Sequence, residues 1–325
     1  MTTTEKLPFD ATWTALSRAH IAFDDDAPGV VRVTGKDARR FVHRLSTQHV
    51  VERPASSACF NTFLDKKGRV RHVAHHVTLD DETVLLVAAP FAPPGEGARL
   101  SEWLSSFHFA EELAIVDESA SMRATVLAGR ALPAPWDALQ GDDARVDGAA
   151  VGARTFDLRV DDGKPVPAIV IVAPRDARVL VDVARGDDDA LECARIAGCV
   201  PRAGREATDA VNPLELGLTR AIHWDKGCYT GQEVLSRVEN RGKQARALVG
   251  LVVAGEVAVG DLVVGDTVKV GDESLGVLTS VAPRATDALP RALAVLRTQE
   301  DVAALSLVVV HGGASHVARA VRAAH

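Results

Sequence analysis

A reactive cysteine is the first chemical feature that the sequence indicates. Cys228 lies in the segment DKGCYTGQE, two residues after Lys226. Thr230 and Glu233 have the spacing of a capping box, which predicts a helix over 231–241 with Cys228 just before its amino terminus. The positive end of the helix dipole and a nearby ammonium both favour the thiolate, which is the nucleophilic and metal-binding form of cysteine. We therefore predict catalytic roles for Cys228 and Lys226.

The other cysteines do not show the spacing of a metal site. Cys59, Cys193 and Cys199 lack a paired CxxC pattern, so we expect free thiols, with Cys193 and Cys199 in the core. A lone cysteine is often a small buried apolar residue, and this interpretation is also open for Cys228. Lys226 is likewise compatible with a solvated surface charge.

Three histidines fall on one predicted strand, at 70–79. Side chains alternate along a strand, so His72 and His76 share one face and His75 points to the other. Three rings arranged in this way do not converge on one ion, and we predict no metal site there.

Basic residues gather after the cysteine. Between positions 220 and 246 there are six basic residues and three acidic ones, although the whole chain has a net charge of −7. Arg237, Arg241, Lys243 and Arg246 are candidates to bind the acidic tail of a ligand or an RNA phosphate. A solvated helix face is the alternative.

Composition excludes several classes of protein. The chain has 325 residues, 47% of them hydrophobic, which suffices for two or three domains. The net charge of −7 and the pI near 5.9 argue against stable binding to nucleic acid or to a membrane surface. The polar start MTTTEKLPFD is unlike a signal peptide, and no apolar run has the length of a spanning helix. We therefore expect a cytoplasmic protein that has no membrane partner.

The pattern of apolar and breaker residues predicts an α+β fold. Thr34 is the expected N-cap of a helix through Leu45, because apolar residues recur from Ala38 at helical spacing. Further helices are expected at 98–107 and 188–197, and strands at 70–79, 83–88, 168–173 and 179–183.

The local composition of the sequence changes after about residue 245. Short valine- and leucine-rich runs, broken by glycine and aspartate, predict a small, closed β domain. We expect two domains, 1–245 with two interleaved subdomains, and 246–325. The expected strands of the second domain lie at 248–253, 262–264, 267–270, 293–296 and 305–310.

The segment around Cys228 resembles a motif of a known family. Lys226–Glu233 reads KGCYTGQE and looks like the KGCYxGQE motif of the YgfZ-type family, whose members are related to the glycine-cleavage aminomethyltransferases. Weaker similarity extends along the chain, for example at DKKGR and PLELG. The resemblance implies an arrangement of domains around a central folate-binding channel, ending in a small β-barrel-like domain. It also implies that Cys228 is the residue most tied to activity.

The same resemblance implies a cofactor and partners. The cofactor would be tetrahydrofolate or a related folate, and the partners would be iron–sulfur client enzymes, including enzymes of tRNA thiomodification. A transient contact between Cys228 and an iron–sulfur cluster is part of this expectation. The candidate folate contacts are Tyr229, Gln232, Glu233, Arg237, Arg241 and Glu215.

Two positions depart from the folate-dependent pattern. No carboxylate occurs from residue 66 to 79, where aminomethyltransferases carry a catalytic aspartate, so ordinary aminomethyl transfer is not expected. Ala197 takes the place of a glutamate that binds the pterin ring, which argues against tight folate binding. Glu215 is a candidate substitute, but Asn212-Pro-Leu-Glu215 also predicts a capping box.

Three functions are compatible with these residues. The first is a folate-dependent accessory protein for the maturation or repair of iron–sulfur enzymes, acting through Cys228 as a factor more than as a turnover enzyme. The second is a tetrahydrofolate-dependent one-carbon transferase or demethylase, with Cys228 or a histidine in place of the missing aspartate. The third is a binding module that has lost folate.

Overall fold

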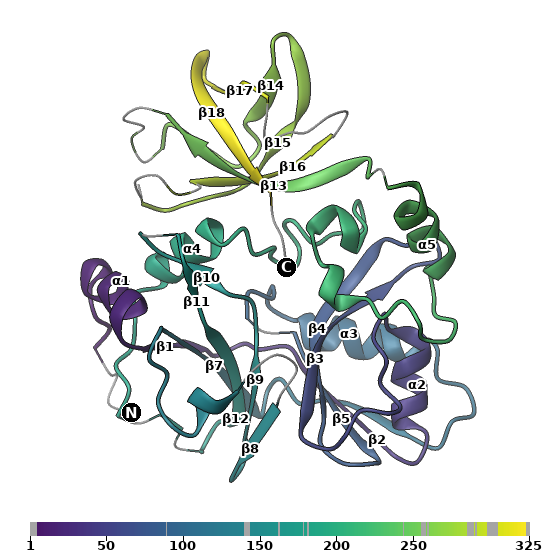
Figure 1. Ribbon diagram of the computed structural model, residues 1–325. Helices are drawn as coiled ribbons and strands as arrows, with labels where there is room; N and C mark the ends of the chain where they lie inside the picture. The colour runs from purple at the N-terminus through teal and green to yellow at the C-terminus, as the bar shows by residue number, and fades with distance from the viewer. Residues whose placement is uncertain are drawn as a thin grey trace.

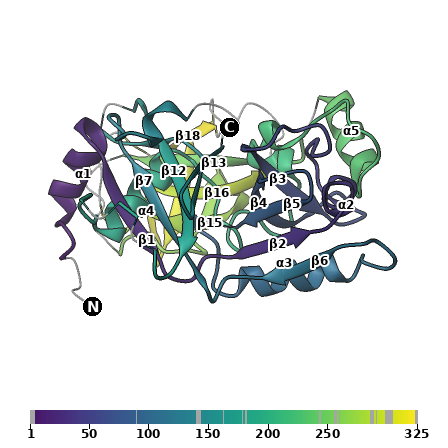
Figure 2. The ribbon, with the colours of Figure 1, turned by 90° about the horizontal axis from the view of Figure 1, so that it is seen from below.

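Two antiparallel sheets and a closed barrel make up the molecule. The computed structural model describes residues 5–88, 90–139, 144–161, 163–177, 179–180, 182–242, 244–254, 258, 260–284, 289, 291–297 and 305–322. Within these residues each large sheet has five strands and the barrel has six. Figure 1 shows the two sheets side by side below the barrel, and Figure 2 shows them from below. The predicted α+β class and multidomain arrangement are confirmed.

The first sheet is covered on one face by two helices. In spatial order its strands are β3 (Ser57–Leu64), β4 (Val70–Thr78), β5 (Thr83–Val87), β2 (Val30–Thr34) and β6 (Ala114–Asp117), and its helices are α2 (Ala38–Leu45) and α3 (Glu96–Ser105). Phe41 of α2 and Leu100 of α3 share a buried cluster with Phe63 of β3. The helix that begins at Ala38 is confirmed, but its N-cap is Asp37, because the predicted cap, Thr34, ends a strand.

The second sheet packs against the first. Its strands are β1 (Ile21–Asp25), β7 (Met122–Ala128), β12 (Ala168–Pro174), β9 (Ala150–Arg154) and β8 (Ala144–Asp147), and nearby lie α1 (Phe9–Arg18), η1 (Trp136–Ala138), the pair β10 (Leu158–Arg159) and β11 (Pro165–Val166), and α4 (Asp188–Ala197). Leu85 and Val87 of β5 lie in one cluster with Val170 and Val172 of β12. The strand expected at 179–183 is wrong, because residues 179, 180, 182 and 183 do not form a strand.

The barrel confirms the predicted closed β domain. Its strands follow the order β13 (Arg246–Val253), β16 (Ala292–Arg297), β15 (Glu273–Val281), β14 (Thr267–Val270), β17 (Leu307–His311) and β18 (Ala314–Arg322). Pairing of β13 with β18 closes the circle, and alternate residues such as Val249 and Leu251 fill the interior. The expected strand at 262–264 is a turn region, and β15 and β18 were not predicted.

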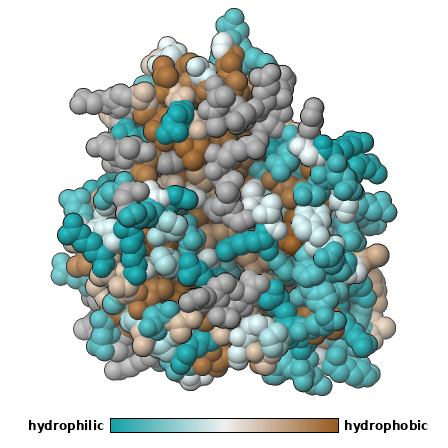
Figure 3. Space-filling model, in the orientation of Figure 1, coloured by the Kyte–Doolittle hydropathy of each residue, from teal (hydrophilic) through white to brown (hydrophobic). Residues whose placement is uncertain are grey.

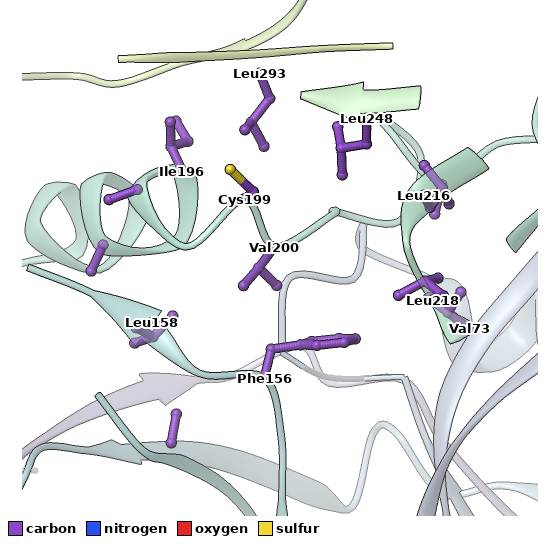
Figure 4. Close-up of a cluster of buried hydrophobic side chains, with 14 of the residues drawn as sticks. Val73, Phe156, Leu158, Ile196, Cys199, Val200, Leu216, Leu218, Leu248 and Leu293 are labelled. Carbon is purple, nitrogen blue, oxygen red and sulfur yellow. The ribbon is translucent and has the colours of Figure 1, made fainter. Parts of the chain in front are cut away.

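An apolar cluster joins the barrel to the elements around the second sheet. Leu248 and Leu293 of the barrel meet Ile196 of α4 and Leu158 of β10 in one buried group, and Cys199 points into it (Figure 4). Burial raises the pKa of the Cys199 thiol to about 11. This thiol therefore packs as an apolar side chain, as predicted. Cys193 is buried in the same way, and burial raises its pKa to about 11.

A buried ion pair lies at the same junction. Arg195 and Glu206 are each almost fully buried, with Nη1 and Oε2 3.4 Å apart. Ser280 of β15 donates to Glu206 at 2.6 Å and accepts from Arg195 at 2.8 Å. The barrel is thus held by a polar network as well as by apolar contact.

The chain between α4 and the barrel runs along the first sheet and its helices. It contains η2 (Pro213–Leu216), η3 (Thr219–Ala221) and α5 (Gln232–Arg241). Asn212 and Glu215 form the predicted capping box at the start of η2. Hydrophilic residues cover the lobe that carries α2 and α5, whereas hydrophobic residues gather on the barrel (Figure 3). Of the helices in the described residues, none is long and apolar enough to cross a membrane.

Candidate functional site

Cys228 lies in a cavity of about 490 Å³. Three parts of the chain form its walls: the turn between β3 and β4, the helix α3, and residues 228–234. Cys228 is exposed, whereas the other three cysteines of the chain are buried. The cavity therefore contains the accessible thiol of the four. The lining consists of Leu64, Asp65, Lys66, Trp103, Phe107, Cys228, Tyr229, Thr230, Gly231, Gln232, Glu233 and Val234.

Gly231 determines how the cysteine loop meets the neighbouring turn. Its φ of +84° lies in the left-handed region, which glycine adopts without a steric penalty. A Cβ at this position would lie 2.7 Å from the carbonyl oxygen of Asp65 and 2.9 Å from the Cα of Gly68. Both are backbone atoms, so the turn itself would have to move. This glycine thus allows the close contact beside the cavity.

The helix α5 begins at the cavity, but without the predicted cap. Its N-cap is Gly231 and has no side-chain hydrogen bond, so the capping box of Thr230 and Glu233 is wrong. The left-handed conformation of Gly231 places the start of the helix one residue later than the pattern predicts. Cys228 still lies three residues before the N-cap.

The ammonium of Lys226 binds to main-chain oxygens. Lys226 is 5% exposed, and Nζ donates to the carbonyl oxygens of Ser46 at 2.6 Å, Gln48 at 2.9 Å and His43. An ammonium has three hydrogens, so these carbonyls use its full donor capacity. Burial lowers the pKa of Lys226 to about 7. The structure does not pair this ammonium with the Cys228 thiol, and a catalytic role for Lys226 stays a prediction.

Tyr229 lies beneath the lysine. Nζ of Lys226 is 5.0 Å from the centre of the Tyr229 ring. Tyr229 is largely buried, and within the described residues its hydroxyl has no hydrogen-bond partner. Burial raises the pKa of Tyr229 to about 12, so the phenol is neutral at physiological pH.

Three histidine rings form a group, and one of them, His43, lies close to Lys226. The ring centres of His43 and His49 are 4.8 Å apart, and those of His49 and His223 are 5.2 Å apart. Burial, followed by the charge of Lys226, lowers the pKa of His43 to about 4, so this ring is neutral at pH 7. In the part of the chain that the structure describes, no group of His, Cys, Asp or Glu has the arrangement of a metal site. The sequence did not predict this group, because His223 is more than 170 positions away from His43 and His49.

The histidines of β4 point to both faces of the sheet, as predicted. Nδ1 of His72 lies 2.7 Å from Oε1 of Glu96 in α3. On the other face, Nε2 of His75 lies 3.0 Å from Oγ1 of Thr155, near the second sheet. His76 contacts Thr78 at 3.0 Å. Burial lowers the pKa of His75 and of His76 to about 3. Both rings are therefore neutral and enclosed at physiological pH.

The predicted folate contacts do not form one site. Tyr229, Gln232 and Glu233 line the Cys228 cavity, but Arg237 and Arg241 are exposed on α5 and do not belong to the lining. The predicted basic group also included Lys243, which lies outside the described residues, and Arg246, which begins β13.

Glu215 acts as a cap in the structure. Its carboxylate accepts from the Asn212 amide at 2.9 Å and pairs with Arg69 at 3.0 Å. The residue is 2% exposed, so both contacts are sheltered from water. These bonds occupy the group that was a candidate substitute for the missing pterin-binding glutamate.

The position expected for that glutamate is apolar. Ala197 is buried on α4 in one cluster with Cys193 and Ile196. The carboxylate of Glu206, which binds Arg195 of the same helix, is already bonded to Ser280 and to the Arg202 amide. The predicted residues therefore do not fit a pterin ring in the expected way.

Two aromatic residues of the cavity were not predicted. Trp103 and Phe107 are four residues apart in sequence, and their ring centres are 4.8 Å apart. Their spacing at i and i+4 predicts a shared helix face. Nothing in the local sequence shows that this face meets residues 228–234, which are more than 100 positions away.

The fold is similar to that of a solved aminomethyltransferase of the glycine cleavage system. The structure aligns with the crystal structure of aminomethyltransferase T from Bartonella henselae at a TM-score of 0.80 and 16% sequence identity, over 99% of this chain and 90% of that chain. The chain has the aminomethyltransferase fold. At this identity the likeness concerns the fold alone.

The sequence comparisons are weaker. No family model matches the chain. The chain is 24% identical over 269 residues to a chloroplastic protein of Arabidopsis thaliana that is named as a transferase; this covers 78% of the chain and 59% of that protein. It is 42% identical over 57 residues, or 18% of the chain, to an aminomethyltransferase of Koribacter versatilis, of which these residues are 15%. The chain thus spans less than two thirds of the length of each of these relatives.

Proposed function

We propose that this protein is an accessory factor for the maturation or repair of iron–sulfur enzymes, including tRNA-thiomodifying enzymes, and that Cys228 is its acting residue. One observation carries the proposal: residues 228–233 of the segment KGCYTGQE, which resembles the YgfZ-type motif, form one wall of the cavity with the accessible thiol. The aminomethyltransferase fold supports the proposal, because members of the YgfZ-type family are related to these enzymes.

The chemistry that we propose uses the Cys228 thiolate. A thiolate can ligate an exposed iron of a client cluster. It can also attack the outer sulfur of a mixed disulfide on a client cysteine, which forms a disulfide on Cys228, breaks the client disulfide and releases the client thiolate. Cys59, Cys193 and Cys199 are buried and cannot resolve such an adduct without unfolding of their surroundings. The thiol that releases Cys228 must therefore come from the client or from a small thiol in solution.

Binding of a folate-type ligand is a separate part of the proposal. It is supported by the aminomethyltransferase fold, but Ala197 and the occupied carboxylates of Glu206 and Glu215 do not provide the expected pterin contact. Titration with tetrahydrofolate, followed through the four tryptophans of the chain, tests this part by itself. Absence of binding at high micromolar ligand would remove folate and leave the role of Cys228 intact.

Replacement of Cys228 tests the main proposal. In cells that lack the endogenous protein, Cys228→Ala should reduce the activity of an iron–sulfur enzyme under oxidative stress to the level without any protein, because the accessible thiol is lost. Cys193→Ala is the matched control; it removes a buried thiol from a helix and should retain full support. Equal support by Cys228→Ala and by the unsubstituted protein would rule out this function.

A tetrahydrofolate-dependent one-carbon transferase is the second candidate function. No carboxylate is present on β4, and His75 and His76 are neutral and enclosed, so the structure offers no replacement for the missing aspartate among them. Methylene transfer between tetrahydrofolate and an amine by the purified protein would favour the transferase.

A further inference from the structure

The segment that carries Cys228 is attached to the segment that follows α2. Thr47 Oγ1 donates to the carbonyl oxygen of Ala221 at 2.5 Å, and Gln48 Nε2 donates to that of Arg220 at 2.5 Å. The amide of His223 donates to the carbonyl oxygen of Thr47 at 2.9 Å. These bonds hold the chain in place as far as residue 223.

Beyond residue 223 the main chain has little support of its own. Residues 224–231 are all described and contain a turn at 224–225, but among the described residues none of their amides donates a hydrogen bond to the main chain outside this segment. A loop without main-chain bonds to its surroundings depends on side chains to fix its position. Within 224–231 the side chain with the most hydrogen bonds is that of Lys226.

The ammonium of Lys226 meets the carboxyl-terminal end of α2. His43 lies in the last turn of this helix and Ser46 is its C-cap, so their carbonyls lie where helical carbonyls lack partners within the helix. A cation at this end is also favoured by the helix dipole. Lys226 therefore completes α2 and fixes the loop with the same three bonds.

Among the described residues, the ammonium has no carboxylate partner. Its neighbours are the rings of His43 and Tyr229, the buried ring of His76 and the buried thiol of Cys59. The ring of His49 lies against that of His43, and the ring of His223 lies against that of His49. Burial lowers the pKa of Lys226, whereas the three carbonyls favour the charged form. The contacts of this lysine are thus directed at main-chain oxygens and not at an acid or a substrate.

We propose that Lys226 is a positioning residue, which fixes the Cys228 loop on the end of α2 through its three carbonyl bonds and does not activate the thiol by its charge. This inference rests on the proposed role of Cys228. Since Lys226 and Cys228 are two residues apart, a shift of the lysine moves the cysteine relative to the cavity. The geometry of the three carbonyls, rather than the sign of the charge, is the essential property.

Two substitutions separate geometry from charge. Lys226→Arg keeps the charge, but its planar guanidinium cannot reproduce the arrangement of a compact ammonium among three carbonyls. Lys226→Met keeps much of the length and removes both the charge and the bonds. Lys67→Met is the matched control, because Lys67 is exposed on the nearby turn and does not line the cavity.

Two measurements report on the Cys228 loop itself. The rate of Cys228 alkylation by iodoacetamide is recorded against pH, with the site verified by mass spectrometry and Cys228→Ser as the blank. Hydrogen exchange of residues 224–231 is recorded on the same proteins. We expect both Lys226 variants to shift the midpoint of the pH–rate profile equally, by about 0.3 units or more, because the thiol loses its fixed environment. We also expect about tenfold faster exchange in 224–231 for both, and no change for Lys67→Met.

Other results would overturn the inference. A profile of Lys226→Arg like that of the unsubstituted protein, with a shift in Lys226→Met, would show that the charge acts on the thiol. An unshifted midpoint in both variants would leave Lys226 with a merely structural role.

A measurement on the unsubstituted protein covers the case in which the variants do not fold. If Lys226 joins the two segments, the amides of 43–50 and those of 223–226 should open together, with exchange rates that respond equally to denaturant. Independent opening would contradict the inference. The proposed function is tested separately: loss of client support in Cys228→Ala with unchanged alkylation profiles in the Lys226 variants refutes only the positioning role.

Discussion

Lys226 places an ionisable group where water hardly reaches it, and this has a consequence for stability. Burial lowers its pKa to about 7 in the folded protein, whereas an unfolded lysine has a pKa near 10.4. Between these values the unfolded chain binds more protons than the folded one, so the free energy of unfolding should rise with pH. Below about pH 7 Lys226 is protonated in both the folded and the unfolded protein, so its contribution to the free energy of unfolding no longer changes with pH.

This pH dependence is testable by urea unfolding between pH 7 and 8.5. The unsubstituted protein should gain up to about 1.4 kcal/mol per pH unit from this group, and Lys226→Met should lose that slope. The upper limit is chosen because Cys193 and Cys199 act in the opposite direction at higher pH: burial raises their pKa to about 11. Equal slopes for the two proteins would show that Lys226 stays charged throughout, held by its carbonyls.

At the residue scale the sequence predicted the thiol but not its surroundings. Cys228 could be selected from its glycine-rich neighbourhood and its place before a helix. The carbonyl partners of Lys226 could not, since they lie 178 to 183 residues earlier and belong to the main chain, which every residue type has. The departure at Ala197 was visible in the sequence, and the structure adds that its place is filled by apolar neighbours.

At the scale of elements, local patterns predicted the helices α2 to α5, but among the described strands before the barrel they predicted only β4, β5 and β12. The helices at Ala38–Leu45 and Asp188–Ala197 follow from apolar spacing alone. The caps of α2 and α5 were wrong, because strand pairing of Thr34 and the tight contact of Gly231 override the local signal. Tertiary contacts decide where an element starts, and a local pattern does not contain them.

The contact of α5 with the β3–β4 turn yields a prediction for Gly231. Gly231→Ala should lower the free energy of unfolding by at least about 2 kcal/mol, because a left-handed conformation is strained for alanine and its Cβ would meet main-chain atoms. Urea unfolding measures the change. Gly227→Ala is the control: its Cβ would meet no atom within 4 Å, and the expected change is within about 0.5 kcal/mol.

A small effect of Gly231→Ala would mean that the turn can move away from the motif. In that case the cavity wall would be adjustable rather than fixed by the glycine. Hydrogen exchange of residues 65–69 in the variant would then show faster opening of the turn.

At the scale of the whole molecule, the sequence predicted the closed barrel from its change in local composition but not how the barrel is attached. The attachment depends on residues that the sequence gives no reason to connect: Arg195 of α4, Glu206 of the following loop and Ser280 of the barrel. A fully buried arginine is uncommon, and its position becomes intelligible only with its partners in place.

This network predicts that Glu206 couples the barrel to the rest of the chain. Glu206→Gln keeps the shape but leaves the buried guanidinium of Arg195 with less compensation, so the free energy of unfolding should fall by about 3 kcal/mol. Arg205→Gln is the control, because Arg205 is exposed and its nearest contact with Glu192 is 3.9 Å, and its effect should stay within about 0.5 kcal/mol. Arg195→Met combined with Glu206→Gln should cost less than the sum of the single changes, since the two groups interact directly. Strictly additive effects would show that the barrel is held by the apolar cluster alone, with the ion pair contributing no coupling.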